Sequence, residues 1–417
     1  MNSKNIPNIQ QKKLRKKILL SAFTCDPSSG SEAAYGWNWA TGLVSENFEV
    51  HCLTRITNKT KISKHPKVPG LYFHYISVPI GLEFLYAYSQ SAMYFYYLIW
   101  QWKALCYAKK LQKIHRFEKV HHVTWGSLQQ GSFLYKLNIP FIFGPAGGGQ
   151  VAPEAFKDYF LHYWLAEKKR EKVSKLMLRF SPACRKMLSK ADAVIVSNTD
   201  TMALAKAGGA KRIFFTLDTA IPESFFPSHP LSRQITSGKL KLLWVGRFLP
   251  RKGLVFVLEV MKELKKYPGI TLTIVGDGEI RETVIKLHKE FQLEDTVNLV
   301  GAVPYRKVRK YYTEHDAFFF TSFRESGGIQ LVEAMAFGLP VITLDLHGSS
   351  EIITEHTGFK IPINEPEQVK AELVQAIVRI SNDPECYKTM SNSASSFAKE
   401  QTWSKKIRSV IKNCYNT

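Results

Sequence analysis

The sequence lacks any cysteine spacing typical of a metal site or of a disulfide framework. Its six cysteines are scattered over 417 residues, and none of them forms a CxxC pair. Such usage is typical of a reducing compartment, where most cysteines serve as small core residues. The sequence therefore predicts a cytoplasmic protein.

A long apolar run is also missing. A membrane-spanning helix needs about 20 apolar residues, and the nearest candidate, residues 84–102, is interrupted by two serines and two glutamines. Residues 1–17 are polar and basic, and the apolar run that starts at Ile18 is too short for a signal peptide. We expect neither a membrane span nor a secretory signal.

Acidic residues are scarce relative to basic ones. The chain has 35 aspartates and glutamates against 57 lysines and arginines, which gives a formal net charge of +22. The excess lies in the first half, at residues 1–17, 103–119 and 162–190. Such a field attracts nucleic acid, anionic membranes or anionic substrates. Because the chain contains no recognisable nucleic-acid-binding module, the first of these partners is disfavoured.

One segment of the first half is unusually rich in aromatic residues. Ten of the 24 residues from Phe84 to Tyr107 are aromatic, and basic residues follow them. One interpretation is a helical hairpin over residues 84–113 at a membrane interface, with aromatic rings at headgroup depth and basic side chains against anionic lipid. The alternative is a helix pair buried against the sheet. A helix predicted over residues 162–190 allows the same two interpretations.

Strands and helices alternate along the chain, with one interruption. The first half begins with a strand predicted over residues 16–23, a helix over 31–43 and a strand over 49–54. Residues 217–238 contain several prolines, serines and threonines and break the pattern, which restarts with a strand over 240–245. The sequence therefore predicts an α/β protein of two Rossmann-like, doubly wound domains with a cleft between them. No GxGxxG motif follows the first strand, so a dinucleotide fingerprint is absent there.

The stretch from Arg324 to Pro340 combines a glycine turn with two carboxylates. Residues 326–328 form a flexible turn, and a short helix is predicted over residues 329–337. Free N–H groups at a helix start favour anions, and glycine lets a phosphate approach the backbone. Glu325 and Glu333 would reach hydroxyl groups on either side of a bound diphosphate. The stretch therefore favours the binding of a nucleotide sugar.

Two cations strengthen this interpretation. Arg247 follows the first strand of the second domain, and Lys252 comes just before its helix. Strand-end loops of a parallel sheet face the ligand crevice, where two cations can hold a diphosphate and neutralise it as a leaving group. The alternative is two solvated charges beside a helix start. The Glu-x7-Glu spacing is uninformative alone, since Glu282 and Glu290 repeat it on a helix that we expect to be solvated.

Several of these motifs resemble glycosyltransferase family 4, whose members are retaining group 1 glycosyltransferases with the GT-B fold. The resemblance is most specific in residues 240–360 and rests on Gly246-Arg247, Lys252-Gly253, Ile274-Val-Gly-Asp-Gly278, Val300-Gly301 and Glu325 with Glu333-Ala-Met-Ala-Phe-Gly-Leu-Pro340. In the first half, Gly30-Ser31-Glu32 and residues 191–197 are similar to the N-terminal domain of the family.

The resemblance implies a role for each matched residue. Glu325 would contact the hydroxyls of the donor sugar, Glu333 the nucleotide ribose, and Arg247 with Lys252 the diphosphate. The other donor contacts that it implies are Gly30, Gly276, Gly327, Gly328 and Ile329. Because the family usually has a bulky residue where Gly327 stands, we expect a more open diphosphate turn.

The resemblance also implies a histidine near the reacting sugar. Two adjacent residues, His121 and His122, match this position, and we predict that His122 is the catalytic one. A histidine at a strand end is alternatively a core residue whose hydrogen bonds are satisfied.

The implied organisation has four parts. Residues 1–216 form an acceptor-binding domain, 217–238 a linker, 239–400 a nucleotide-sugar-binding domain, and 401–417 a C-terminal helix that crosses back to the first domain.

The implied activity is that of a retaining hexosyltransferase. It would move a sugar from a UDP- or GDP-linked donor to a hydroxyl acceptor, a lipid-linked or polysaccharide glycan in envelope, capsule or exopolysaccharide biosynthesis. We expect an anionic membrane surface as a partner, with the protein peripheral on the inner face of the cytoplasmic membrane, and no nucleic acid, cofactor or essential metal. The alternatives are a GT-B nucleotide-sugar epimerase and a non-catalytic sugar-nucleotide-binding protein.

Overall fold

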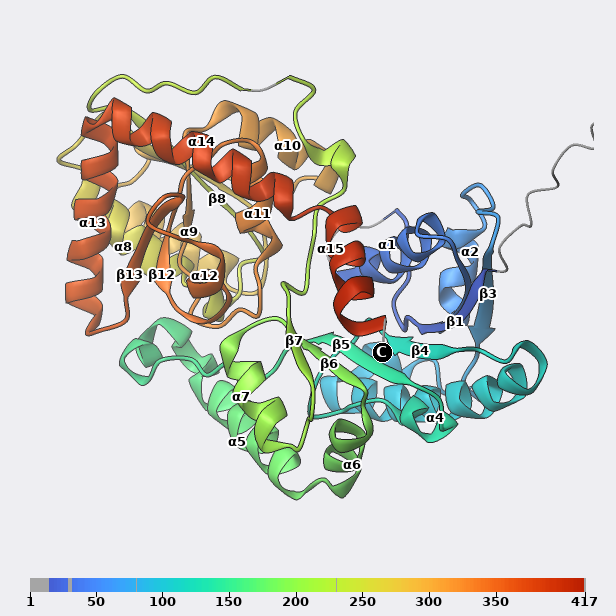
Figure 1. Ribbon diagram of the computed structural model, residues 1–417. Helices are drawn as coiled ribbons and strands as arrows, with labels where there is room; N and C mark the ends of the chain where they lie inside the picture. Colours follow the sequence, from blue (N-terminus) through green and yellow to red (C-terminus); the bar gives the residue numbers. More distant parts are fainter. Residues whose placement is uncertain (1–14, 29–31, 80, 230, 416–417) are drawn as a thin grey trace, which may run out of the picture.

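The computed structural model describes residues 15–28, 32–79, 81–229 and 231–415 (Figure 1). The first half of the chain contains β1 (Lys16–Ser21), α1 (Glu32–Ser45), β2 (Phe48–Arg55), η1 (Ile56–Asn58), α2 (Lys59–Ile62), β3 (Leu71–Ile76), α3 (Leu85–Tyr88), α4 (Gln90–His115), β4 (Lys119–His122), η2 (Phe133–Leu137), β5 (Phe141–Ala146), η3 (Glu154–Tyr163), α5 (Trp164–Phe180), α6 (Pro182–Lys190), β6 (Ala193–Val196), α7 (Thr199–Ala207) and β7 (Ile213–Phe215).

The second half contains η4 (Glu223–Phe225), β8 (Leu240–Val245), η5 (Pro250–Lys252), α8 (Leu254–Leu264), β9 (Ile270–Val275), α9 (Arg281–Glu290), β10 (Val297–Gly301), α10 (Tyr305–Glu314), β11 (Ala317–Phe320), α11 (Ile329–Ala336), β12 (Val341–Asp345), α12 (His347–Ile352), β13 (Gly358–Pro362), α13 (Pro366–Asn382), α14 (Pro384–Glu400), α15 (Trp403–Val410) and η6 (Ile411–Tyr415).

Each half builds one parallel sheet. The first has seven strands in the order β3-β2-β1-β4-β5-β6-β7, and the second has six in the order β10-β9-β8-β11-β12-β13. In both sheets the chain order reverses beside the first strand, and ligands of such sheets bind at the carboxyl ends of the strands near that point. The predicted fold class of two doubly wound domains, the GT-B architecture, is confirmed. The predicted limits at residues 216, 238 and 400 stay a prediction.

The inner strands of the first sheet are buried on both faces, as is typical of parallel sheets, whereas the edge strands β3 and β7 are partly exposed. Along β1, Ile18 and Leu20 pack in one cluster with α1, whereas Leu19 packs in a second cluster with α4. Figure 1 shows the same division, with α1 and α15 on one side of the sheet and α4, α6 and α7 on the other. Runs of apolar residues in these strands therefore reflect two covered faces.

The chain returns to the first domain at its C-terminal end. Trp403, Ile407 and Val410 of α15 are buried in the same cluster as Trp39 of α1. Figure 1 shows α15 beside α1. Just before α15, Ile221 and Thr402 form a parallel bridge, so the two connections between the domains lie side by side. The predicted return of a C-terminal helix to the first domain is confirmed.

Two predicted helical segments differ from the structure. Instead of a hairpin or helix pair over residues 84–113, the one-turn α3 precedes a single helix, α4, of 26 residues. Ser89 begins α4, because its hydroxyl accepts a hydrogen bond from the N–H of Ala92 at 3.2 Å. The helix predicted over 162–190 is divided into α5 and α6, since Ser181 caps α6 and Pro182 stands at its start.

The described structure also gives the state of the cysteines and the hydropathy of the helices. All six cysteines lie within the described residues, and each is free. Across the described ranges, no helix combines the length and the hydropathy that crossing a membrane requires.

Candidate functional site

A cavity of about 330 Å³ lies where the carboxyl ends of the two sheets face each other. Its lining comes from both domains and from the connection between them: Tyr35, Val123, Trp125, Gly126, Pro145, Gly147, Asp218, Arg247, Arg251, Lys252, Glu325, Ser326, Gly328, Ile329 and Gln330. This position is where a doubly wound fold binds its ligand. We call it the interdomain cavity.

Three cations enter the interdomain cavity from the segment between β8 and α8. Lys252 is only 5% exposed, and its ammonium group donates to Oε2 of Glu325. Arg251 donates to the same oxygen at 3.0 Å from Nη1. Arg247 is exposed, and its guanidinium group forms no hydrogen bond or ion pair with any residue of the described ranges. One cation is thus available to a ligand, and two are held by a single carboxylate.

Burial and these cations shift the pKa of Glu325 in opposite directions. Burial would raise the pKa of its carboxyl group, but Lys252 and Arg251 outweigh burial and lower this pKa to about 2. Burial in turn lowers the pKa of Lys252, and the charge of Glu325 opposes that change. Glu325 is therefore ionised at neutral pH, with its charge balanced inside the cavity.

The start of α11 forms another wall of the cavity. Gly328 precedes this helix with a φ of 80°, a left-handed conformation that glycine adopts without strain. No side chain caps the helix there, and its first turn carries no acidic residue. The first N–H groups of α11 therefore remain available to an anion at the cavity.

Gly327 lies against the connection between the domains rather than in an open turn. A Cβ atom at this position would overlap the carboxylate of Asp218. The expectation of a more open diphosphate turn is therefore wrong, because Asp218 fills the space that a side chain would occupy. Burial raises the pKa of Asp218, while the charge of Lys406 opposes this change.

Glu333 does not line the interdomain cavity. It lies one helical turn after Ile329, which does, and it is 2% exposed. Its two oxygens accept hydrogen bonds from Tyr305 at 2.5 Å and Tyr312 at 3.0 Å. Burial raises the pKa of Glu333, and the two tyrosine donors oppose it.

His122 also lies outside the cavity lining. Its Nε2 is 3.1 Å from the hydroxyl of Tyr97, its Nδ1 is 3.1 Å from that of Ser21, and burial lowers its pKa to about 4. The neighbouring His121 contacts the hydroxyl of Tyr415 at 2.8 Å and the carbonyl of Gly144 at 2.7 Å. Both histidines are therefore core residues with satisfied ring nitrogens, which was the alternative interpretation.

Two predicted donor glycines remain. Gly30 lies outside the described residues. Gly276 has a φ of 148° and packs so closely on the backbone of Gly246 that a Cβ atom would overlap its carbonyl. This glycine thus allows the loops after β8 and β9 to touch, and it is not among the residues that line the cavity.

Some cavity residues were not predicted. Arg251 stands beside Lys252, and the adjacent basic pair was the available signal. Ser326 joins the domains, because its hydroxyl lies 2.9 Å from that of Ser197 and its carbonyl accepts from Asn198 at 3.1 Å. No local pattern marks such a contact, since its partners follow strands of different sheets and are distant in sequence.

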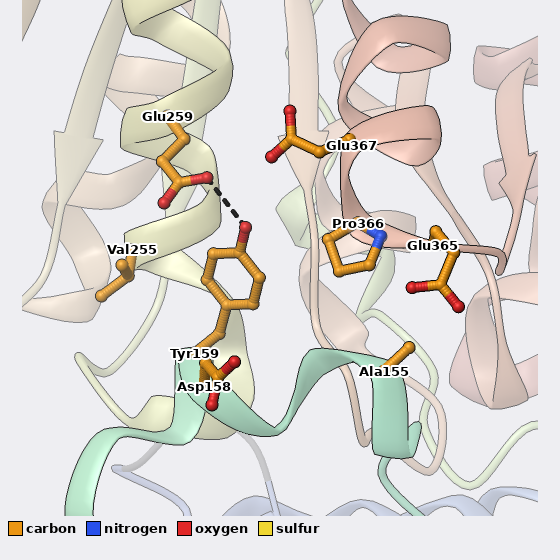
Figure 2. Close-up of a pocket in the computed structure, with 8 residues that line it drawn as sticks. All are labelled: Ala155, Asp158, Tyr159, Val255, Glu259, Glu365, Pro366 and Glu367. Carbon is orange, nitrogen blue, oxygen red and sulfur yellow. Dashed lines mark hydrogen bonds between the residues drawn. The ribbon is translucent and has the colours of Figure 1, made fainter.

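A second cavity, of about 360 Å³, lies between η3 of the first domain and α8 and α13 of the second (Figure 2). Figure 2 shows Tyr159 pointing to Glu259, whose oxygen accepts from the tyrosine hydroxyl at 2.8 Å. Asp158, Glu365 and Glu367 add further carboxylates to the lining. Although this cavity is slightly larger, its carboxylates would repel a diphosphate, so it does not suit a nucleotide sugar.

Comparisons with known proteins connect these features to a family. Residues 228–397 match the family described as glycosyl transferases group 1. An uncharacterized glycosyltransferase of Haemophilus influenzae is 31% identical over 179 residues, which cover 42% of this chain and 48% of that protein. The chain thus spans about half of the length of this relative.

Two further similarities extend over most of the chain. The alpha-monoglucosyldiacylglycerol synthase of Acholeplasma laidlawii is 26% identical over 379 residues, 86% of each chain. The crystal structure of Anabaena HepE in complex with UDP and glucose has a TM-score of 0.63 at 16% identity, covering 95% of this chain and 100% of that one. The structural likeness supports the two-domain fold.

Proposed function

We propose that this chain transfers a sugar from a nucleoside diphosphate sugar to a hydroxyl acceptor with retention of configuration, and the match of residues 228–397 to the glycosyl transferases group 1 family supports this. The observation that carries the proposal is the interdomain cavity, where Arg247, Lys252 and the uncapped start of α11 meet Glu325. Cations and helix N–H groups suit a diphosphate, and a carboxylate suits sugar hydroxyls.

In the proposed reaction, the bond between the anomeric carbon and the diphosphate oxygen breaks, and its electron pair leaves with the diphosphate. Arg247, Arg251 and Lys252 stabilise that charge together with the N–H groups of α11. The acceptor oxygen bonds to the anomeric carbon on the same face. Its proton passes to the departing phosphate oxygen. Glu325 orients the sugar through its hydroxyls and is not itself attacked.

The remaining donor contacts follow from the same arrangement. Gly327, Gly328 and Ile329 bring the backbone turn to the diphosphate. Glu333 is proposed to hold the ribose, since it stands one turn beyond Ile329 on the same face of α11. Tyr305 would then share the carboxylate with the ribose hydroxyls. His122 is left out of the proposed site, because each ring nitrogen makes one hydrogen bond and both are used, whereas each carboxylate oxygen of Glu333 can accept a second one.

We also propose a UDP- or GDP-linked donor and no essential metal for transfer. Anabaena HepE, which shares the fold, has been crystallised with UDP and glucose, and this supports a nucleotide-sugar donor. Three side-chain cations line the interdomain cavity, which supports charge neutralisation of a leaving diphosphate by the protein. Transfer should therefore continue in EDTA, and a rate restored only by added Mg²⁺ or Mn²⁺ would contradict the metal-independent mechanism.

The acceptor is proposed to be lipid-linked or a polysaccharide at an anionic membrane surface. The outward face of α4 carries Phe95 and Trp102, which are 57% and 58% exposed, followed by Lys109 and Lys113. Aromatic rings beside lysines are typical of helices that lie at a membrane interface. The name of the Acholeplasma relative, a diacylglycerol glycolipid synthase, supports a lipid acceptor.

A donor panel tests the transfer proposal. UDP, GDP and their sugars should be compared for the thermal shift that each gives, since a bound ligand stabilises the native state. The selected sugar nucleotide is then assayed with lipid acceptors, using Glu325→Gln and, as the matched control, Glu282→Gln on the exposed face of α9. Only the first variant should lose transfer.

The products distinguish the alternatives. Free nucleotide without glycoside would favour the epimerase, and binding without turnover would favour the non-catalytic protein. Transfer by Glu325→Gln at the parental rate would show that the proposed site is wrong.

Vesicle flotation tests the membrane proposal. The protein should float with vesicles that contain anionic lipid at low salt, and Phe95→Ser with Trp102→Ser should weaken this binding. Phe215→Ser, an exposed aromatic on β7, is the control. Absence of flotation by the parental protein would contradict the proposed binding to an anionic membrane surface.

A further inference from the structure

Three histidines and a glutamate gather at the edge of the first sheet. Glu49 and His51 lie in the first half of β2, His74 lies on β3, and His115 is the last residue of α4. Glu49 is paired in register with Lys17, the second residue of β1, and His115 comes four residues before β4 begins, so the cluster lies toward the amino ends of the strands, away from the interdomain cavity at their carboxyl ends. The cluster plays no part in the proposed transfer.

The ligand atoms of this cluster are close enough to share one ion. One ligand atom each from Glu49, His51 and His115 lie within 4.8 Å of one another. Oε1 of Glu49 is 3.2 Å from Nε2 of His51. An ionised carboxylate only accepts hydrogen bonds, so a proton or a metal ion must lie between these two atoms.

We propose that Glu49, His51 and His115 bind a Zn²⁺-type divalent metal ion. Zinc binds nitrogen and carboxylate oxygen at about 2.0–2.2 Å in a tetrahedron, which places its ligands roughly 3.3–3.5 Å apart. The Glu49–His51 distance of 3.2 Å is just below this spacing. His115, which is partly exposed at the end of a helix, closes the remaining gap by a rotation of its ring. A water molecule completes the coordination.

The surroundings of the cluster favour such an ion. Nδ1 of His51 is 2.9 Å from Nε2 of His74, a contact of the kind that orients a metal-bound histidine. His51 is 3% exposed and therefore cannot swing into solvent. His115 closes the C-terminal end of α4, where the helix dipole attracts a cation.

One residue competes with the ion. Nζ of Lys17 is 3.5 Å from the same Glu49 oxygen, and it must share the carboxylate or withdraw when the metal binds. Its side chain is 34% exposed, so withdrawal into water is open to it. Two imidazoles and one carboxylate select Zn²⁺ over Mg²⁺ or Mn²⁺, which prefer oxygen ligands.

Occupancy would join β2 to the end of α4. The helix that carries Phe95 and Trp102 would then be fixed to the sheet at its far end by a metal bridge. The site therefore gives the aromatic helix a support that is independent of the donor cavity.

The test uses the full chain and Zn²⁺ itself. Bound metal is counted after dialysis, and affinity is measured by competition with a chromophoric chelator. We expect one Zn²⁺ per chain and a zinc-dependent rise of the unfolding temperature. His115→Ala and Glu49→Gln should each weaken binding by at least about tenfold. The control is His356→Ala, because His356 lies beside Glu355 on the surface and no third ligand joins them among the residues that the structure describes.

Three outcomes decide the proposal. Selective loss of zinc in His115→Ala and Glu49→Gln, with the control unchanged, supports it, and a tetrahedral visible spectrum with Co²⁺ would add to that support. Equal zinc binding by His115→Ala and the parental protein overturns it, as does the absence of zinc binding by the parental protein. Since His115 is partly exposed, its variant should unfold at the parental temperature in a chelator, which separates metal loss from misfolding.

Discussion

Replacing Glu325 by glutamine removes the anion that balances Lys252 and Arg251 in the interdomain cavity. Their charges lower the pKa of Glu325 from 4.5 to about 2. At about 1.36 kcal/mol per pKa unit, this difference corresponds to about 3 kcal/mol in favour of the ionised form. Removal of one partner from a buried ion pair costs about 3–5 kcal/mol, because the other charge is left buried and unpaired. We therefore expect Glu325→Gln to lose about 3 kcal/mol of stability at pH 7.

Thermal unfolding measures this loss. For a domain of roughly 150–250 residues, 1 kcal/mol shifts the midpoint by about 2–4 °C, so the second domain of Glu325→Gln should melt about 6–12 °C lower. Glu282→Gln is the control, because Glu282 is exposed on α9 and has the same spacing to Glu290. An unchanged midpoint for Glu325→Gln would refute the charge balance inferred for the cavity.

The pH dependence of stability tests whether the ionised form of Glu325 stabilises the folded state. Since the pKa of Glu325 is depressed in the folded state, its stabilising contribution is complete above pH 4.5 and disappears as the pH falls toward about 2. The gap between the parental protein and Glu325→Gln should close over that range. A gap of constant size down to the lowest accessible pH would mean that the loss has another cause.

Nucleotide binding by Glu325→Gln tests whether Glu325 contacts the sugar or the diphosphate of the donor. With Glu325 gone, Lys252 and Arg251 have no carboxylate partner, and a diphosphate supplies the missing charge. UDP or GDP, whichever the parental protein binds, should therefore bind Glu325→Gln at least as well, although sugar transfer is lost. Loss of nucleotide binding would place Glu325 at the diphosphate and contradict the proposed division of roles.

Three further predictions concern other parts of the site and its supports. Arg247→Ala should weaken nucleotide binding about tenfold or more, since charge-assisted hydrogen bonds contribute about 1.5–3 kcal/mol, and leave the unfolding midpoint unchanged because Arg247 is exposed; the exposed Arg281→Ala is the calorimetric control. Glu333→Ala should cost about 1–3 kcal/mol in urea unfolding, because it leaves two tyrosine hydroxyls without their acceptor, whereas Tyr305→Phe should cost less. Burial lowers the pKa of Lys406 from 10.5 to about 7. Between these two pH values the unfolded chain binds the proton more tightly than the folded chain does. The free energy of unfolding should therefore rise with pH by up to about 1.4 kcal/mol per pH unit. Lys406→Met should lack this slope in unfolding measurements from pH 7 to 9, and an identical slope would show that other groups cause it.

The regular parts of the fold were predictable because short-range patterns determine them. Leu240–Val245 is the strand that its apolar run predicts, and the helix after Gly328 ends just before Gly338, as the glycine indicates. The two cations and Glu325 could also be placed, because the loops after parallel strands must meet at one edge of the sheet. Local sequence and topology were sufficient for these residues.

The contacts between distant segments were not predictable. Adjacent strand residues point to opposite faces, so His121 and His122 face different helices, and each face is covered by aromatic residues from elsewhere in the chain. Gly327 seemed to open a turn because nothing near it in sequence indicates that Asp218 fills the space. The aromatic residues at 84–107 are evident in the sequence, but their division into a buried and an exposed face depends on which side of a single long helix packs on the sheet.

The return of α15 has a consequence for genetics and for protein engineering. The first domain is built from two segments that are distant in the gene, because Trp403 and Ile407 cover the same core as Trp39. A nonsense codon near position 401 would leave the second sheet intact and expose the apolar wall of the first domain. A chimaera that exchanges the nucleotide-binding half with a relative should therefore take residues 401–415 from the same parent as the first domain.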